Sequence, residues 1–347
     1  MLNVTNSPIR GIIPPHMLEE IAKRGTKSQK DWALHNLTFA GFVRGQRQAM
    51  AAFPQAGAVG HKYRTINDNK HEGGNPPTGT LVRKEGDPAS VDPAVNEAYD
   101  GAGATYDLYY DVYQRNSIDD RGMSLVSFVH YESNFNNAFW DGSEMVYGDG
   151  DGDIFDRFTK CIDVIGHELT HGVTQFEANL AYSGQPGALN ESMSDVFGSL
   201  VKQRFLNQTA DKADWLIGAG LFTSKIQGQA LRSMKAPGTA YDDPTIGKDP
   251  QPADMKHYVK TSSDNGGVHI NSGIPNHAFY LAATAIGGNA WEKAGKIWYV
   301  ALRDRLRSRS TFKGAATATI SVAKGLFGDG SNEMKAVQSA WKSVGVI

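Results

Sequence analysis

The spacing of apolar residues near the N-terminus predicts two short helices followed by a linker. Pro15 can begin the first helix and Gly25 can end it, because proline suits a first helical turn and glycine suits a helix end. The apolar residues of this part are Met17, Leu18, Ile21, Trp32, Leu34, Leu37 and Phe39. They are too few to form a core alone, so they must bury against the rest of the chain. Residues 42–60 are rich in Gly, Ala, Gln and Arg, which is typical of a linker.

After this linker the apolar pattern alternates between helix and strand. A helical spacing runs over 91–113, and short strand patterns occupy 125–131 and 145–147. Residues 156–205 carry two further helical patterns, and helices dominate from about 206 onward. The pattern predicts an α+β fold, with a mixed α/β N-terminal domain and a mainly helical C-terminal domain.

Composition excludes several classes of partner. The chain has 347 residues, enough for about two domains, and a formal net charge of −2. Such a chain has no electrostatic attraction to nucleic acid or to an anionic membrane, so neither is an expected partner. No stretch approaches about 18 apolar residues, so no transmembrane helix is expected. The single cysteine, Cys161, cannot form an intramolecular disulfide.

The N-terminal residues bear on the location of the protein. The opening Met-Leu-Asn-Val-Thr-Asn-Ser-Pro lacks the basic start and the apolar run of a secretory signal peptide. The sequence therefore predicts a cytoplasmic protein by default, or one that is exported by a route without a signal peptide.

The strongest candidate chemistry lies in the predicted helix 159–176. His167-Glu168-Leu169-Thr170-His171 places two imidazoles four residues apart, on one helical face, so that both can reach one metal ion. Glu168, one position on, can address a water molecule beside that ion. This spacing is typical of zinc-dependent peptidases, although a helix with two surface histidines is the simpler alternative.

A second helix supplies the missing ligand. A catalytic zinc ion usually takes three protein ligands and leaves a fourth position for water. Glu191 can complete a His₂Glu set, and Asp195, four residues later, can accept the second ring N–H of a ligand histidine. Like Asp195, Asn190 is expected to support the ligands without binding the ion itself. The pairing of these two helices favours a metal centre over a solvated helix face.

Longer motifs give the sequence a resemblance to a known family. Asn-Asn-Ala-Phe-Trp-Asp-Gly at 136–142, Tyr-Gly-Asp-Gly-Asp-Gly at 147–152, Leu-Arg-Ser-Met at 231–234 and Asp-Asn-Gly-Gly-Val-His-Ile-Asn-Ser-Gly at 264–273 follow in order. With the two helical motifs, they resemble the thermolysin-like zinc endopeptidases from about 133 to 273. Pro14-Pro15-His16-Met17-Leu18 resembles the Pro-Pro-x-x-Leu element of the short propeptides in protealysin-like precursors.

The resemblance implies roles for further residues. Glu168 would be the general base, with one catalytic zinc ion held by His167, His171 and Glu191. Tyr182 and His269 would stabilise the oxyanion, and Asp264 would orient His269. Peptide or protein substrates would bind through Asn137, the backbone of Ala138, and Arg232. The pocket after the cleaved bond would be lined by Phe155, Phe158, Val164, Ile217, Leu221 and Leu231, which favours a large hydrophobic residue there.

The resemblance also implies a domain division and an inhibited precursor. Residues 1–50 would form a short helical propeptide, 51–184 the N-terminal catalytic domain with the zinc helix, and 185–347 the C-terminal helical domain. The active-site cleft would lie between the two domains. The propeptide would act as an intramolecular inhibitor, and cleavage between about Arg44 and Phe53 would release activity.

The paired calcium site known in thermolysin is expected to be absent here. Carried over by position, it would use Asp163, Lys202, Asp214, Leu216 and Ala219. Only two carboxylates remain, whereas calcium takes six to eight oxygen ligands. We expect Lys202 to pair with Asp163 or Asp214 instead.

Two alternatives compete with the peptidase hypothesis. Asp149, Asp151 and Asp153 imitate the start of an EF-hand loop, but Ile154 and Lys160 replace the glycine and glutamate that such a loop requires. The other alternative is an inactive relative that only binds peptides. Loss of Glu168 or of a zinc ligand would indicate it, and all of these residues are present.

Overall fold

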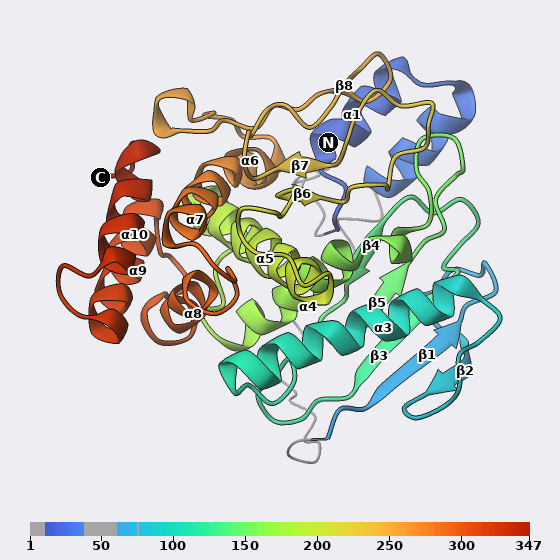
Figure 1. The fold of residues 1–347 in the computed structure, drawn as a ribbon. Coiled ribbons are helices and arrows are strands. Elements are labelled where there is room, and N and C mark those ends of the chain that lie inside the picture. Colours follow the sequence, from blue (N-terminus) through green and yellow to red (C-terminus); the bar gives the residue numbers. More distant parts are fainter. Residues whose placement is uncertain (1–10, 38–60, 75) are drawn as a thin grey trace.

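The computed structural model describes residues 11–37, 61–74 and 76–347 (Figure 1). Phe39 and the predicted cleavage region between Arg44 and Phe53 lie outside the described residues.

The N-terminal segment forms the helix that the sequence predicts. Helix α1 spans Pro15–Arg24, with the proline in its first turn, and it ends at Gly25, whose N–H donates to Ile21 C=O at 2.8 Å. Its apolar face is buried, and residues 27–37 are also helical. The prediction of burial is wrong for Leu34, which is 55% exposed because it lies on the outward face of this second helix.

A five-stranded mixed sheet forms the frame of the N-terminal part. Its strands are β1 (Arg64–Asp68), β2 (Thr80–Lys84), β3 (Leu125–Val129), β4 (Ala138–Trp140) and β5 (Glu144–Tyr147). They lie in the order β2-β1-β3-β5-β4. The three central strands β1, β3 and β5 run parallel to one another, and each edge strand, β2 beside β1 and β4 beside β5, is antiparallel to its neighbour. The carboxyl ends of β1, β3 and β5 therefore meet at the same end of the sheet.

Helix α3 covers this sheet and links it to the centre of the molecule. It spans Pro93–Asp107, begins at Asp92, whose side chain accepts from Ala94 N–H, and continues as a π-helix over Leu108–Val112. It packs on β1 and β3 on one side and on α4 on the other (Figure 1). The helical spacing predicted over 91–113 is thus confirmed.

Two long helices occupy the centre. After a 3₁₀ turn at Phe158–Lys160, α4 spans Ile162–Phe176, and α5 spans Gly184–Phe205. Glycines let them approach closely: a Cβ added to Gly198 would lie 2.4 Å from Asp163 O, and one added to Gly166 would lie 3.0 Å from Gly198 Cα. This close contact fixes the position of the side chains that the two helices present to each other.

The C-terminal part is mainly helical, as expected. Its helices are α6 (Asp264–Asn271), α7 (Gly273–Ile286), α8 (Ala294–Val300), a π-helix (Ala301–Arg305), α9 (Phe312–Phe327) and α10 (Asn332–Ser343). Before them come the strand pairs β6 (Leu216–Ile217) with β7 (Arg232–Ser233) and β8 (Asp242–Asp243) with β9 (Gly247–Lys248), and a 3₁₀ turn (Met255–His257). Figure 1 shows the sheet and the C-terminal helices on opposite sides of α4 and α5. The α+β prediction is confirmed.

Candidate functional site

Three predicted metal ligands meet between α4 and α5. His167 and His171 lie on one face of α4, and Glu191 faces them from α5. The two Nε2 atoms are 3.1 Å apart, and each lies 3.5 Å from a Glu191 carboxylate oxygen. All three side chains are buried. Ligand atoms around a tetrahedral zinc ion with bonds of about 2.0 Å stand about 3.3 Å apart, so this set has the separations that zinc needs.

Partners on α5 determine which ring nitrogens face the ion. Asp195 Oδ1 lies 2.8 Å from His167 Nδ1, and Asn190 Oδ1 lies 2.9 Å from His171 Nδ1. Because these oxygens accept hydrogen bonds, each Nδ1 carries the proton and each Nε2 presents a lone pair. The two Nε2 lone pairs therefore point into the same space, an arrangement that a cation between them stabilises.

The charges around the ligands favour an ionised carboxylate. Burial alone would raise the pKa of Glu191, but nearby positive charge, that of His269 foremost, lowers it below its usual range. Glu191 is therefore negatively charged at neutral pH, as a metal ligand must be.

Glu168 lies beside the ligand histidines and is fully buried. Its Oε2 accepts a hydrogen bond of 3.0 Å from the backbone N–H of Trp140, at the end of edge strand β4. Trp140 is distant in sequence from α4, so a separate part of the chain orients the Glu168 carboxylate.

Tyr182 and His269 approach the ligand set from the other side. The Tyr182 hydroxyl donates to Glu191 and lies 3.2 Å from His269 Nε2. Asp264 Oδ1 lies 2.6 Å from His269 Nδ1, and its other oxygen accepts from the His269 backbone N–H at 2.8 Å. Burial would lower the pKa of His269, but Glu191 and Asp264 outweigh it and raise that pKa to about 9. The ring is therefore held in one orientation as a donor.

A left-handed turn makes the double contact of Asp264 possible. Asp264, Asn265, Gly266 and Gly267 have φ angles of 51°, 52°, 83° and 75° at the start of α6. Such angles are accessible mainly to Gly, Asn and Asp. The two glycines and Asn265 therefore explain why the chain turns here so that Asp264 faces His269.

Arg232 on β7 is anchored by Asp195. Its Nε and one terminal nitrogen donate to the two Asp195 oxygens at 2.9 and 2.8 Å, and Asn276 donates to the same carboxylate at 2.8 Å. Burial would raise the pKa of Asp195, but Arg232 and His167 hold it well below its usual range. Asp195 thus connects the metal-ligand helix to Arg232.

The N-terminal segment lies on the residues predicted to bind substrate. Ile12 N–H donates to Ala138 C=O at 3.1 Å, and Ile12 C=O accepts from Arg232 at 3.3 Å. Ile13 N–H donates to Asn137 Oδ1 at 3.3 Å. A Cβ on Gly11 would lie 2.7 Å from Asn137 Oδ1, so any other residue here would require the Asn137 side chain to move.

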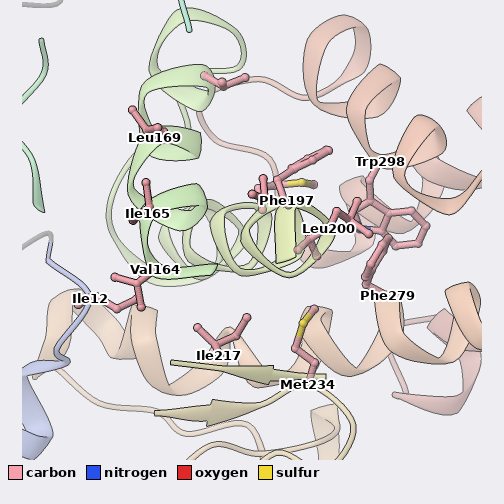
Figure 2. Close-up of a cluster of buried hydrophobic side chains, with 14 of the residues drawn as sticks. Ile12, Val164, Ile165, Leu169, Phe197, Leu200, Ile217, Met234, Phe279 and Trp298 are labelled. Carbon is pink, nitrogen blue, oxygen red and sulfur yellow. The ribbon is translucent and has the colours of Figure 1, made fainter. Parts of the chain in front are cut away.

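The predicted pocket residues are all buried. They are Phe155, Phe158, Val164, Ile217, Leu221 and Leu231, and they belong to the main hydrophobic core of the described residues. Ile12 is also fully buried in this core. Figure 2 shows Ile12 pointing from the N-terminal segment toward Val164 on α4.

Family comparisons agree with this geometry. The chain matches a family model described as "Thermolysin metallopeptidase, catalytic domain" over residues 53–175. It matches a second model, "Thermolysin metallopeptidase, alpha-helical domain", over residues 178–346. The chain belongs to the thermolysin metallopeptidase family. It is therefore a metalloendopeptidase of a zinc-dependent family, and its His167, His171 and Glu191 fit zinc as ligands.

Several relatives match most or nearly all of the chain. An "Extracellular metalloprotease" of Pectobacterium carotovorum is 49% identical, over 98% of this chain and 97% of the relative. An "Extracellular minor metalloprotease" of Serratia marcescens is 45% identical, over 82% of this chain and 80% of the relative. The solved "Precursor of Protealysin" from Serratia proteamaculans superposes with a TM-score of 0.89 at 52% identity, covering 97% of this chain and all of that one. The predicted likeness to protealysin-type precursors is confirmed.

The cytoplasmic location that the sequence suggested is wrong. Similar relatives are named extracellular, which points to export. The prediction failed because it rested only on the missing signal-peptide pattern at the N-terminus, and that pattern is not the sole marker of export. Within residues 11–37, 61–74 and 76–347, no helix has the length and apolar character needed to span a membrane.

Three contacts at the site were not foreseen from the sequence. Ser194 Oγ lies 3.0 Å from His171 Nδ1, Trp140 N–H binds Glu168, and Asn276 binds Asp195. Ser194 could have been found, because it lies four residues after Asn190 on the same face of α5. The other two depend on how distant segments pack, and no local spacing indicates them.

Proposed function

We propose that this chain is a zinc endopeptidase that is held as an inhibited precursor by its own N-terminal residues. One observation carries the peptidase proposal. The Nε2 atoms of His167 and His171 are buried 3.1 Å apart, Glu191 lies beside both, and Glu168 is next to them on α4. We propose the domain division given by the sequence, with residues 1–50 as propeptide, 51–184 as catalytic domain and 185–347 as helical domain.

In the proposed mechanism Glu168 moves the protons. His167, His171 and Glu191 would hold zinc, which would lower the pKa of a bound water to about 7 and polarise the substrate carbonyl. Glu168 accepts the proton of the attacking water and passes it to the leaving nitrogen. The hydrogen bond from Trp140 N–H to one Glu168 oxygen keeps the carboxylate in position for both transfers.

His269 and Tyr182 are proposed to stabilise the charge that develops on the substrate oxygen. Fixed donors at such a position contribute roughly 3 kcal/mol each. The side chains of Tyr182 and His269 both lie close to the Glu191 carboxylate. Asp264 keeps the His269 ring protonated and oriented. Asn190 and Asp195 are proposed to fix the rings of the two ligand histidines.

Substrate is proposed to bind as an added strand along β4. Asn137, the backbone of Ala138, and Arg232 already hydrogen-bond to the backbone of Ile12 and Ile13, which supports their role in binding the backbone of a peptide.

The proposed pocket predicts the cleavage preference. Its lining of Phe155, Phe158, Val164, Ile217, Leu221 and Leu231 is apolar and buried. We expect cleavage on the N-terminal side of large hydrophobic residues, because burying an apolar side chain stabilises the complex by about 1.5–3 kcal/mol. Phe158 fills more of the pocket than a leucine would, so the bulkiest residues should be disfavoured. Profiling a peptide library tests this, and a preference for charged residues after the cleaved bond would exclude it.

The precursor proposal rests on Ile12. Its backbone is hydrogen-bonded to Ala138 and Arg232, and its buried side chain points toward Val164 of the proposed pocket (Figure 2), which supports its standing in the place of a substrate residue. A covalently linked segment acts at an effective concentration near the millimolar range, which makes even modest contacts inhibitory. Cleavage between about Arg44 and Phe53 would remove this link.

His16 makes the proposed inhibition sensitive to pH. Its Nε2 lies 3.0 Å from the Tyr241 hydroxyl, and its burial, opposed in part by Asp264, lowers its pKa to about 4. Docking is therefore strongest above the pKa of the free residue, about 6.5, and weakens as pH falls toward 4. We expect the residual activity of the uncut full chain, relative to a chain beginning near residue 51, to rise by up to about tenfold between about pH 7.5 and about pH 5.5.

A matched variant isolates the contribution of His16. His16→Gln keeps a polar group near Tyr241 but cannot titrate, so this rise should shrink or vanish. An equal rise in His16→Gln would mean that another group controls docking. Gels taken at each pH must show that the chain is still uncut.

We predict that calcium stabilises this chain little, because the position of thermolysin's paired calcium site is taken by a lysine. Lys202 Nζ lies 3.1 Å from Asp163 Oδ2, 2.9 Å from Asp214 Oδ2 and 3.0 Å from Leu216 C=O. Burial would lower the pKa of Lys202, but Asp163 and Asp214 outweigh it and raise that pKa, so an ammonium stands among these oxygens. We expect the unfolding temperature of the zinc-loaded chain to be the same with and without added millimolar calcium. A strong rise in calcium would contradict this.

Metal analysis combined with a protease assay tests the proposed activity. In a chain beginning near residue 51, we expect bound zinc, casein hydrolysis, loss of hydrolysis with a chelator, and recovery with added Zn²⁺. Activity that survives complete removal of zinc would defeat the proposal, and so would a zinc-loaded, folded chain without activity.

A further inference from the structure

A second cluster with metal-ligand chemistry lies at the end of the sheet. Among the described residues, two groups of three could hold a metal ion: the catalytic set, and His71, His130 and Asp149. These three residues follow the parallel strands β1, β3 and β5 respectively. Because the carboxyl ends of parallel neighbours meet at one edge, the sheet brings together three side chains that are far apart in the sequence.

The spacing of this sheet-end cluster is close to that of the catalytic ligands. His130 Nδ1 lies 2.7 Å from Asp149 Oδ2, and His71 Nδ1 lies 3.5 Å from the same oxygen. The three ligand atoms all lie within 4.8 Å of one another. A tetrahedral zinc ion requires separations of about 3.3 Å, so no pair of ligand atoms would have to change its separation by more than about 1.5 Å to accommodate it.

A further carboxylate supports His130 from behind. His130 Nε2 lies 2.6 Å from Asp92 Oδ2, and Asp92 is itself fixed because its other oxygen accepts from Ala94 N–H at 2.8 Å. Metal-binding histidines typically donate their second ring N–H to such a carboxylate, which leaves the first nitrogen free for the ion. His130 thus has a partner of the same kind as His167 has in Asp195.

The backbone holds His71 beside His130. His71 N–H donates to His130 C=O at 2.8 Å, and Asn69 N–H donates to Val129 C=O at 2.9 Å. The rings of the two histidines lie 5.4 Å apart, centre to centre. The loop between β1 and β2 therefore runs along the end of β3, and His71, which is half exposed, leaves the cluster open to an ion from solvent.

We propose that His71, His130 and Asp149 bind a second divalent ion of the zinc type, which ties the β1–β2 loop to the ends of β3 and β5. Two imidazoles with a carboxylate suit zinc and neighbouring transition metals, whereas calcium and magnesium prefer oxygen ligands alone. The site is separate from α4 and α5, and it stands whether or not the proposed peptidase activity holds.

The simpler alternative is an ion-pair network without a metal. Hydrogen bonds to Asp149 and Asp92 raise the pKa of His130 to about 9, so in this alternative its imidazolium bridges the two carboxylates. A metal ion would replace the proton on Nδ1 and release it to solvent. Metal stoichiometry distinguishes the two states.

Zinc binding to the full chain tests the proposal. In the full-length Glu168→Gln chain, dialysed against buffered micromolar Zn²⁺, we expect two zinc ions per chain. His71→Ala should lose one of them and keep the other, and it should fold normally because His71 is half exposed. His257→Ala, which removes an exposed histidine paired with Asp254, is the matched control and should keep both.

Cobalt provides an independent readout. After metal removal, Co²⁺ titration should give visible d–d absorption in two steps, and the second step should be missing in His71→Ala. One zinc ion per Glu168→Gln chain with His71 intact would show an ion-pair network only and overturn the proposal. Two ions that both persist in His71→Ala would place the second ion elsewhere and also overturn it.

Discussion

Replacing Glu168 by Gln should lower kcat of the shortened chain by about 10²- to 10⁴-fold, because the proposed general base can no longer accept a proton. Glutamine keeps the size of the side chain and can still accept the Trp140 N–H bond through its amide oxygen. The loss should therefore fall on kcat rather than on KM. Steady-state kinetics with a short fluorogenic peptide measure both constants.

Two controls make this result specific. Glu168 is not among the three proposed ligands, so Glu168→Gln should retain one zinc ion at the catalytic site. Glu292→Gln, which changes an exposed carboxylate in the C-terminal part, should leave kcat unaltered. A Glu168→Gln chain with nearly full activity would exclude Glu168 as the base, and loss of zinc in that chain would indicate a structural role instead.

Replacing Ile12 by Asp should activate the full-length chain without cleavage. Ile12 is fully buried in the hydrophobic core and points toward Val164 (Figure 2), so an aspartate there would place a carboxylate among apolar side chains. Burial of such a charge costs several kcal/mol, so the docked state should be disfavoured on the order of 100-fold or more. The initial rate of peptide hydrolysis by uncut chains reports this change directly.

The matched control adds the same charge to the same segment at an exposed position. Ser28 is exposed in the helical stretch 27–37, so Ser28→Asp should leave the uncut chain inhibited. If Ile12→Asp remains as inhibited as the unsubstituted chain, then the contacts of Ile12 do not hold the segment in place.

The sequence predicted those parts of the site that depend on one helix at a time. His167 and His171 are four residues apart, as are Glu191 and Asp195, and a helix places each pair on one face regardless of what surrounds it. Helix α1 likewise begins at Pro15 and ends at Gly25 as predicted, because these signals also act within one helix.

Contacts between distant segments could not be predicted in this way. Ile12 and Ala138 are joined by a backbone hydrogen bond, which leaves no side-chain signature in either segment. His71, His130 and Asp149 come together only because β1, β3 and β5 pair in parallel, and the sequence predicted the two later strands without their order. The exposure of Leu34 likewise depends on which face of its helix meets the catalytic part.

The most direct measurement compares initial peptide hydrolysis by two zinc-loaded proteins, the full chain and a chain beginning near residue 51, with gels that follow the region between Arg44 and Phe53. We predict that the shortened chain is active at once and is stopped by a chelator. The full chain should be inactive until that region is cut, and then reach the same rate. A full chain that is equally active while still uncut would contradict the account, and so would a shortened chain that is indifferent to the chelator.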